Sequence, residues 1–131
     1  MDRATIDQVA HDVSQSLATG DSRPLRGRLR DNTLLHVPGA SGLSGEYQGV
    51  DAISDLIDRF VDQRKQGLRF TASNVAQGSG GRLQLCGTFE GRRAGRELTV
   101  EAMIEMEVIE GTIREAWLSC PDQTAWDAFW R

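Results

Sequence analysis

The sequence predicts an α+β domain in which helices precede a mostly antiparallel sheet. Apolar residues recur at the helical spacing of three and four, first from Ile6 to Leu17 and again from Asp51 to Arg64. After Gly67 apolar and polar residues alternate, as in half-buried β-strands, and this pattern continues to about residue 120. This order predicts helices packed on the concave face of a curved sheet.

Length and charge restrict the class of protein. The 131 residues accommodate one core, so we expect a single domain over residues 1–131. Fifteen Lys and Arg residues are scattered among 19 Asp and Glu residues, which disfavours a nucleic-acid partner. There is no apolar run of about 18 residues and no apolar signal core near Met1, so we expect no membrane partner and a cytoplasmic protein.

The two cysteines predict neither a metal site nor a disulfide. Cys86 and Cys120 lie in separate predicted strands, without metal-type spacing and without a second Cys or His nearby. We interpret both as reduced structural thiols.

The first helix has one apolar face, and a helix stop follows at Thr19-Gly20. His11 lies about 140° from the centre of that face and is expected in solvent. Ser22 is expected to cap a short second helix that begins around Pro24. The predicted buried residues of the first helix are Ile6, Val9, Ala10, Val13 and Leu17.

A strand is predicted from Thr33 to Val37, with His36 near its end, and a loop from Pro38 to Gly49 follows. His36 has three interpretations: a structural imidazole bonded to the backbone, a ligand contact, or a general acid or base at the mouth of a pocket. Tyr47 either donates its hydroxyl into that pocket or packs under the loop.

The next helix has an apolar face opposite several aspartates, which we assign to solvent rather than to acid catalysis. The strands after it alternate, with turns at Gly78 to Gly81, Gly91 to Gly95 and Glu110 to Thr112. The predicted inward residues of this helix and these strands are Ile53, Leu56, Ile57, Phe60, Val61, Leu68, Phe70, Ala72, Leu83, Leu85, Gly87, Phe89, Leu98, Val100, Ala102, Ile104, Met106 and Val108.

The basic residues near the second of these turns, Arg92, Arg93 and Arg96, are interpreted as a solvated hairpin tip. In the last strand either Glu115 and Trp117 or Ala116 and Leu118 face inward. We favour a solvated Glu115, because an unpaired buried carboxylate is costly. A terminal helix capped by Asp122 is expected to present Trp126, Phe129 and Trp130 on one side.

Several motifs resemble the nuclear transport factor 2-like superfamily, nearest to its polyketide-cyclase-like (SnoaL-like) and ketosteroid-isomerase-like branch. The resemblance covers essentially the whole chain, and it is more specific for fold than for function. The matching motifs are His36-Val37-Pro38-Gly39, Leu43 to Ile53, Glu110 to Trp117, Asp122 and Phe129-Trp130.

This resemblance implies a cone-shaped α+β barrel that encloses an apolar cavity, no cofactor, and a homodimer formed through the outer sheet face. His36 corresponds to or neighbours the position where the isomerases carry their general base. Val13, and Ala102 or Met103, stand where those enzymes place their oxyanion donors, so steroid isomerisation by that mechanism is not expected. Leu118 stands where many cyclase-like relatives have an acid.

Two hypotheses remain. The first is a cofactor-independent enzyme acting on a small hydrophobic molecule, with His36 as acid or base and Tyr47 or Glu115 orienting it. The second is a non-catalytic ligand-binding or dimerisation module that keeps the cavity. The aromatic residues expected to enclose the ligand, besides Tyr47, are Phe60, Phe70, Trp117 and Trp126.

Overall fold

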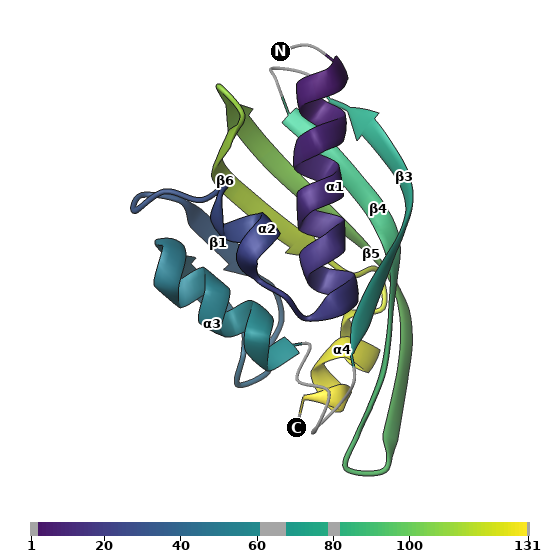
Figure 1. Cartoon of the computed structure of the whole chain (residues 1–131). Coiled ribbons are helices and arrows are strands. Elements are labelled where there is room, and N and C mark those ends of the chain that lie inside the picture. The colour runs from purple at the N-terminus through teal and green to yellow at the C-terminus, as the bar shows by residue number, and fades with distance from the viewer. Residues whose placement is uncertain (1–2, 61–67, 79–81, 131) are drawn as a thin grey trace.

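The computed structural model describes residues 3–60, 68–78 and 82–130, and it has the predicted α+β architecture (Figure 1). Three N-terminal helices lie against one face of a six-stranded curved sheet that does not close, and a short helix follows the last strand. The elements are α1 (Arg3–Thr19), α2 (Arg23–Arg26), β1 (Leu34–Val37), β2 (Gly45–Gln48), α3 (Val50–Phe60), β3 (Arg69–Gln77), β4 (Arg82–Arg93), β5 (Arg96–Ile109), β6 (Thr112–Ser119) and α4 (Gln123–Phe129).

The strands lie in the order β2-β1-β6-β5-β4-β3. The predicted four-strand meander is confirmed, because β3, β4, β5 and β6 pair with their neighbours in antiparallel fashion. β1 pairs with β6 in parallel, so the N-terminal part of the chain extends the sheet beyond its C-terminal strand. No helix in the described part of the chain is long and apolar enough to cross a membrane.

The sequence predicts a loop from Pro38 to Gly49, whereas Gly45–Gln48 form a strand, β2. The strand has four residues, three of them exposed, and Tyr47 is its one apolar side chain. Alternation over so short a segment carries little signal. Antiparallel pairing with β1 supplies its hydrogen-bond partners and forms the edge of the sheet.

The core agrees with the predicted apolar faces of the helices and of β4 and β5. α3 begins at Val50 and is described to Phe60, so the predicted continuation to Arg64, with Val61, lies outside the described residues. Ala72 is exposed rather than inward, although it is still in register with Gly87, and the pairing of β3 with β4 shifts register directly after it, between Ala72 and Asn74.

A β-bulge settles which side of β6 faces the helices. Glu107 of β5 pairs with Glu115, but the next residue, Val108, pairs with Ile113, so Arg114 is an extra residue in β6. Ile113 is therefore buried on the same side as Ala116 and Leu118, while Glu115 and Trp117 face away. Simple alternation could not reveal this arrangement, because the bulge changes the phase within the strand.

The predicted N-terminal cap is present on α4 but not on α2. Asp122 caps α4 as predicted by accepting a hydrogen bond from the Ala125 amide at 3.1 Å. Ser22 makes no side-chain cap bond on α2. Instead, Asp21 accepts from the Arg23 amide at 3.0 Å, and its bonds with Arg23 hold the pKa of the Asp21 carboxyl below its usual value.

The β4–β5 hairpin tip is more than a solvated charge cluster. Arg93 donates to the Phe129 carbonyl at 3.1 Å, and Arg96 donates to the Ala128 carbonyl at 3.2 Å. Both arginines thus reach the C-terminal end of α4, where backbone carbonyls lack helical partners. Their structural role is to tie α4 to the sheet.

Candidate functional site

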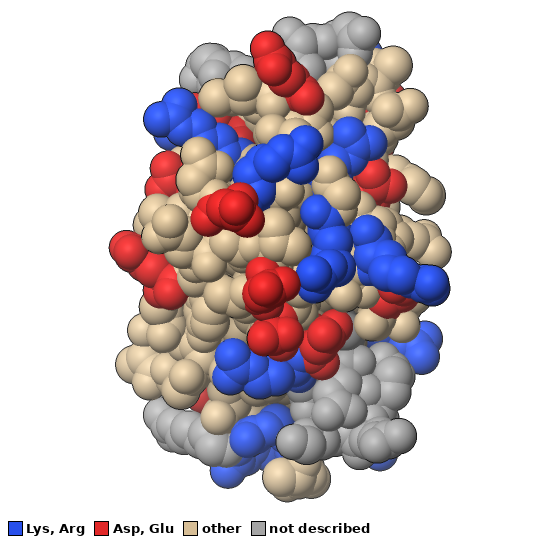
Figure 2. All heavy atoms as spheres, turned by 60° about the vertical axis from the view of Figure 1, so that its left-hand side comes forward, with Lys and Arg blue, Asp and Glu red and all other residues tan. Residues whose placement is uncertain are grey.

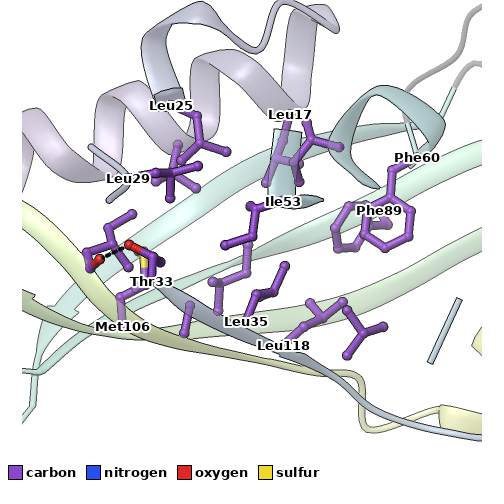
Figure 3. Close-up of a pocket in the computed structure, with 16 residues that line it drawn as sticks. Leu17, Leu25, Leu29, Thr33, Leu35, Ile53, Phe60, Phe89, Met106 and Leu118 are labelled. Carbon is purple, nitrogen blue, oxygen red and sulfur yellow. Dashed lines mark hydrogen bonds between the residues drawn. The ribbon is translucent and has the colours of Figure 1, made fainter. Parts of the chain in front are cut away.

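A cavity of about 50 Å³ lies between the helices and the concave face of the sheet (Figure 3). Helices α1 and α3 and the segment around α2 form one side, and the sheet forms the other. Sixteen described residues line it: Val13, Leu17, Leu25, Leu29, Thr33, Leu35, Val37, Ile53, Ile57, Phe60, Phe89, Ile104, Met106, Ile113, Ala116 and Leu118.

The lining contains one side chain with a polar group, Thr33, and that group is already bonded. The Thr33 hydroxyl donates to the Ile113 carbonyl at 2.6 Å and accepts from the Arg30 amide at 2.9 Å. This pair of bonds joins the segment before β1 to β6. The described residues therefore offer the cavity no titratable group and no spare hydroxyl donor.

Of the aromatic residues predicted to enclose a ligand, Phe60 lines the cavity. Phe70 and Trp126 are fully buried but lie behind the lining. Their ring centroids are 5.0 and 5.3 Å from that of Phe89, and Trp126 is 5.5 Å from Phe60. They support the wall by aromatic packing and do not form its surface.

His36 does not line the cavity. Its neighbours Leu35 and Val37 line the cavity, and successive side chains of a strand point to opposite faces. His36 pairs with Trp117 of β6, which also lies on the outer face of the sheet. Neither residue lines the cavity, so the proposed base and one proposed binding residue are separated from it by the sheet.

On the outer face, His36 and Glu115 are brought together as a pair. His36 Nε2 lies 2.5 Å from Glu115 Oε2, and Nδ1 lies 3.5 Å from Glu46 Oε1. An ionised Glu115 can only accept, so the contact requires a proton on Nε2. The His36 and Glu115 side chains are 26% and 30% exposed. Glu115 is thus half-buried and paired, rather than fully solvated.

Trp117 joins this pair to β4. Its ring stacks on His36 with centroids 5.7 Å apart and planes at 11°, and the Arg82 guanidinium lies 4.6 Å from the Trp117 ring. Arg82 also donates to Glu105 at 2.9 Å, and this bond raises the pKa of Arg82. We call His36, Glu115, Trp117, Arg82 and Glu105 the outer-face cluster.

Tyr47 follows the second of its two interpretations. Its hydroxyl donates to the Leu43 carbonyl at 2.7 Å, so it holds the loop before β2. The residue is opposite Leu35 across the β1–β2 pair and packs against the core without lining the cavity.

The two cysteines are unpaired and lie away from the cavity lining. Cys120 is buried, and burial raises the pKa of its thiol to about 11. Cys86 is partly exposed on the outer face of β4, opposite Met103 of β5. The predicted structural role of the thiols agrees with these positions, and a raised pKa makes Cys120 a poor nucleophile at neutral pH.

Charged side chains of both signs are interspersed on the face around α3 (Figure 2). Arg26 pairs with Asp51 at 3.2 Å, and Arg28 pairs with Asp12 at 2.8 Å. Among the described residues of this face, basic side chains therefore lie next to acidic ones.

Eight of the sixteen lining residues were predicted to face inward, and one of these eight, Phe60, was also predicted to contact a ligand. Leu25, Leu29 and Thr33 surround one end of the cavity but belong to a segment without a clear period. Leu35 and Val37 could have been found, because alternation in β1 places them opposite His36.

The chain matches no protein-family model and no curated protein, but it resembles solved structures over almost its whole length. Bal32a, from a soil-derived mobile gene cassette, is 25% identical over 97% of this chain and 99% of its own, with a TM-score of 0.85. A protein of unknown function with a cystatin-like fold from Xanthomonas campestris is 26% identical over 96% of this chain and 97% of its own, with a TM-score of 0.82.

An NTF2-like protein from Burkholderia xenovorans is 16% identical over 100% of this chain and 99% of its own, with a TM-score of 0.81. The order of helices and strands, the curved open sheet and these matches agree with the motifs found in the sequence. The chain therefore has the α+β fold of the nuclear transport factor 2-like superfamily.

Proposed function

We propose that the protein binds a small apolar molecule in the cavity between its helices and its sheet. The observation that carries this proposal is the lining itself, in which fifteen apolar side chains accompany one threonine whose hydroxyl is already bonded. A polar ligand group there would lose its hydrogen bonds to water without replacement, at a cost of about 1–3 kcal/mol or more. The ligand class is therefore a hydrocarbon, or the hydrocarbon end of a larger molecule.

The cavity volume limits the ligand further. The 50 Å³ is several times the roughly 10–15 Å³ that a water molecule needs, and it is a third of an engineered cavity of about 150 Å³ that binds benzene or xenon. A molecule of a few heavy atoms fits the cavity as it stands. A longer ligand requires part of the wall to move outward.

The lining favours binding over acid or base catalysis inside the cavity. A general acid or base must reach the reacting atom within about 3 Å, or through one water molecule. His36 and Glu115 are on the other face of the sheet, where their contacts join β1 to β6. We therefore assign the His36–Glu115 pair to the stability of that strand junction rather than to turnover of a cavity ligand.

We also propose that the outer sheet face forms a homodimer interface. Trp117 is partly exposed there, and the outward side chains of Leu34 and Met103 add apolar surface. Aromatic residues, Arg and Met are enriched in interfaces, and the outer face carries both Arg82 and several glutamates that a second copy could pair with. A cytoplasmic location is part of the proposal, supported by two unpaired cysteines.

Xenon tests the binding proposal directly. Crystals pressurised with xenon are expected to show one strong anomalous scattering peak inside the cavity. The variant Ala116→Leu adds volume to the lining and is expected to abolish the peak, whereas Ala125→Leu adds the same volume on α4, outside the lining, and should preserve it. Absence of xenon from the cavity of the unmodified protein would refute the proposal.

A further inference from the structure

The outer sheet face carries more carboxylates than cations. Along each strand the side chains that point away from the helices alternate with the buried ones, and directly paired residues of neighbouring strands share a face. Seven glutamates against four arginines give the described strands a net charge of −3 on this face with His36 neutral, while the whole chain has −4 on the same convention. These residues are Glu46, Glu90, Glu97, Glu101, Glu105, Glu107, Glu115, Arg69, Arg82, Arg92 and Arg114.

The negative excess is present at both ends of this face. Near the β5–β6 turn and β1, the strand registers place Glu46, Glu105, Glu107, Glu115, Arg82 and Arg114. Nearer the β4–β5 turn, they place Glu90, Glu97, Glu101, Arg69 and Arg92. A homodimer with twofold symmetry joins the same surface of both copies. Whichever way the two copies are turned, net negative surface therefore lies against net negative surface.

The arginines of this face do not remove the excess, because most of them are already paired within one copy. Three of the four pair with glutamates: Arg82 with Glu105 at 2.9 Å, Arg114 with Glu107 at 3.4 Å, and Arg92 with Glu97. A second copy can exchange these partners across the interface, but it brings its own glutamates with its arginines. Two faces of −3 bring −6 together whatever pairs they form.

Glu101 lies beside apolar surface that the homodimer would cover. Met103 is two positions further along the outward side of β5, and both residues line a groove with Cys86 and Ser119. The arginine pairs given above involve other glutamates, and Glu101 is exposed to water. Covering Met103 with a second copy also takes water from Glu101. A carboxylate that loses water without gaining a cation opposes association.

We infer that ionic strength regulates the homodimer, so that the outer faces associate when salt screens their negative charge and separate when it does not. This inference rests on the proposed homodimer, because it concerns the same face. Like charges brought together across an interface oppose binding. The screening length is about 30 Å at 0.01 M salt and about 10 Å at 0.1 M, so added salt removes most of the repulsion between exposed glutamates. The apolar contacts of Trp117 and Met103 are hardly affected by that screening.

Sedimentation of the full chain at 10 mM and at 300 mM NaCl tests this regulation. The dissociation constant of the dimer is expected to fall by about tenfold or more at the higher salt concentration. Glu101→Gln removes one negative charge from each face with little change of shape. It is expected to tighten the dimer about threefold or more at 10 mM NaCl and to reduce the salt dependence.

Asp55→Asn is the matched control. Asp55 is exposed on α3, which packs on the opposite side of the sheet, so the variant removes the same charge away from the proposed interface. Its dissociation constants should match those of the unmodified protein within about twofold. A dimer that is equally strong at both salt concentrations, or equal effects of the two substitutions, would overturn the regulation and leave the homodimer intact. A monomer under both conditions would instead refute the proposed homodimer and its regulation with it.

Discussion

The two faces of the sheet carry different chemistry, although they are built from the same strands. On the concave side, Leu35, Ala116 and Leu118 line an apolar cavity. On the outer side, the adjacent residues His36, Glu115 and Trp117 belong to a network of ion pairs and stacked rings. Because strand side chains alternate, one residue of separation decides whether a group meets a ligand in the cavity or the solvent-facing network.

This difference shows that a titratable residue beside an apolar strand is weak evidence for an active site. His36 has suitable neighbours in sequence, a pairing carboxylate and partial burial, yet it lies on the face opposite the cavity. The position of Leu35 in the lining is the more informative observation. The alternation of apolar side chains along β1 locates the site better than the presence of an imidazole does.

The largest expected effect is on stability, and it comes from comparing substitutions at two adjacent residues of β6 that lie on opposite faces of the sheet. Leu118→Ala removes a buried side chain from the cavity wall and is expected to reduce the free energy of unfolding by about 2–5 kcal/mol. Ser119→Ala, on the exposed side of the same strand, should change it by no more than about 0.5 kcal/mol. Urea denaturation measures both, and equal losses would show that the concave side is not the tighter-packed face.

A second comparison is between the buried thiol of Cys120 and the partly exposed thiol of Cys86, and its first test is the pH dependence of stability. The folded-state pKa of Cys120 is raised to about 11 from 9.0 by burial, so its contribution to stability is complete below pH 9 and is lost as pH rises toward 11. Urea denaturation series between pH 8 and 11 should show a smaller decline in the free energy of unfolding for Cys120→Ala than for the unmodified protein.

The burial difference between the two thiols can also be tested by labelling. In native buffer a thiol reagent should label Cys86 before Cys120, and simultaneous labelling would contradict the burial difference.

The smallest expected effect concerns the outer-face cluster. His36→Ala and Glu115→Ala should each reduce the free energy of unfolding by about 1 kcal/mol, with a coupling of about 0.5–1 kcal/mol in the double-mutant cycle. Xenon affinity should stay unchanged, because neither residue lines the cavity. A loss of xenon binding in either variant would instead connect the two faces and revive the enzyme hypothesis for His36.

The sequence predicted the architecture well because periodicity and turn chemistry report directly on burial. Helical spacing identified the buried face of α1, and alternation identified that of β5, since these elements are long enough for the pattern to repeat. Short elements were less predictable. β2 was missed because a four-residue strand at the sheet edge depends on pairing with β1 rather than on its own pattern.

The candidate site was predicted in kind but not in most of its residues. Phe60, one of the aromatic residues predicted to contact a ligand, lies in the lining, whereas Phe70 and Trp126 form a layer behind it. Such a distinction depends on which of two buried rings is nearer the void, and hydropathy does not encode depth within a core. His36 and Leu35 are adjacent in β1 and therefore lie on opposite faces of the sheet, and a titratable residue near a strand end does not by itself indicate which face it occupies.

The extra residue in β6 has a consequence for the tolerance of the chain to change. With Arg114 present, Ile113 and Ala116 can both be covered by the helices although they are an odd number of positions apart. Removing Arg114 would place Ile113, Ala116 and Leu118 at alternate positions, so a regular strand could keep all three covered by the helices. A single-codon deletion of Arg114 is therefore expected to do less harm than a deletion in the regular part of β6, which would turn the side chains on one side of it to the wrong face.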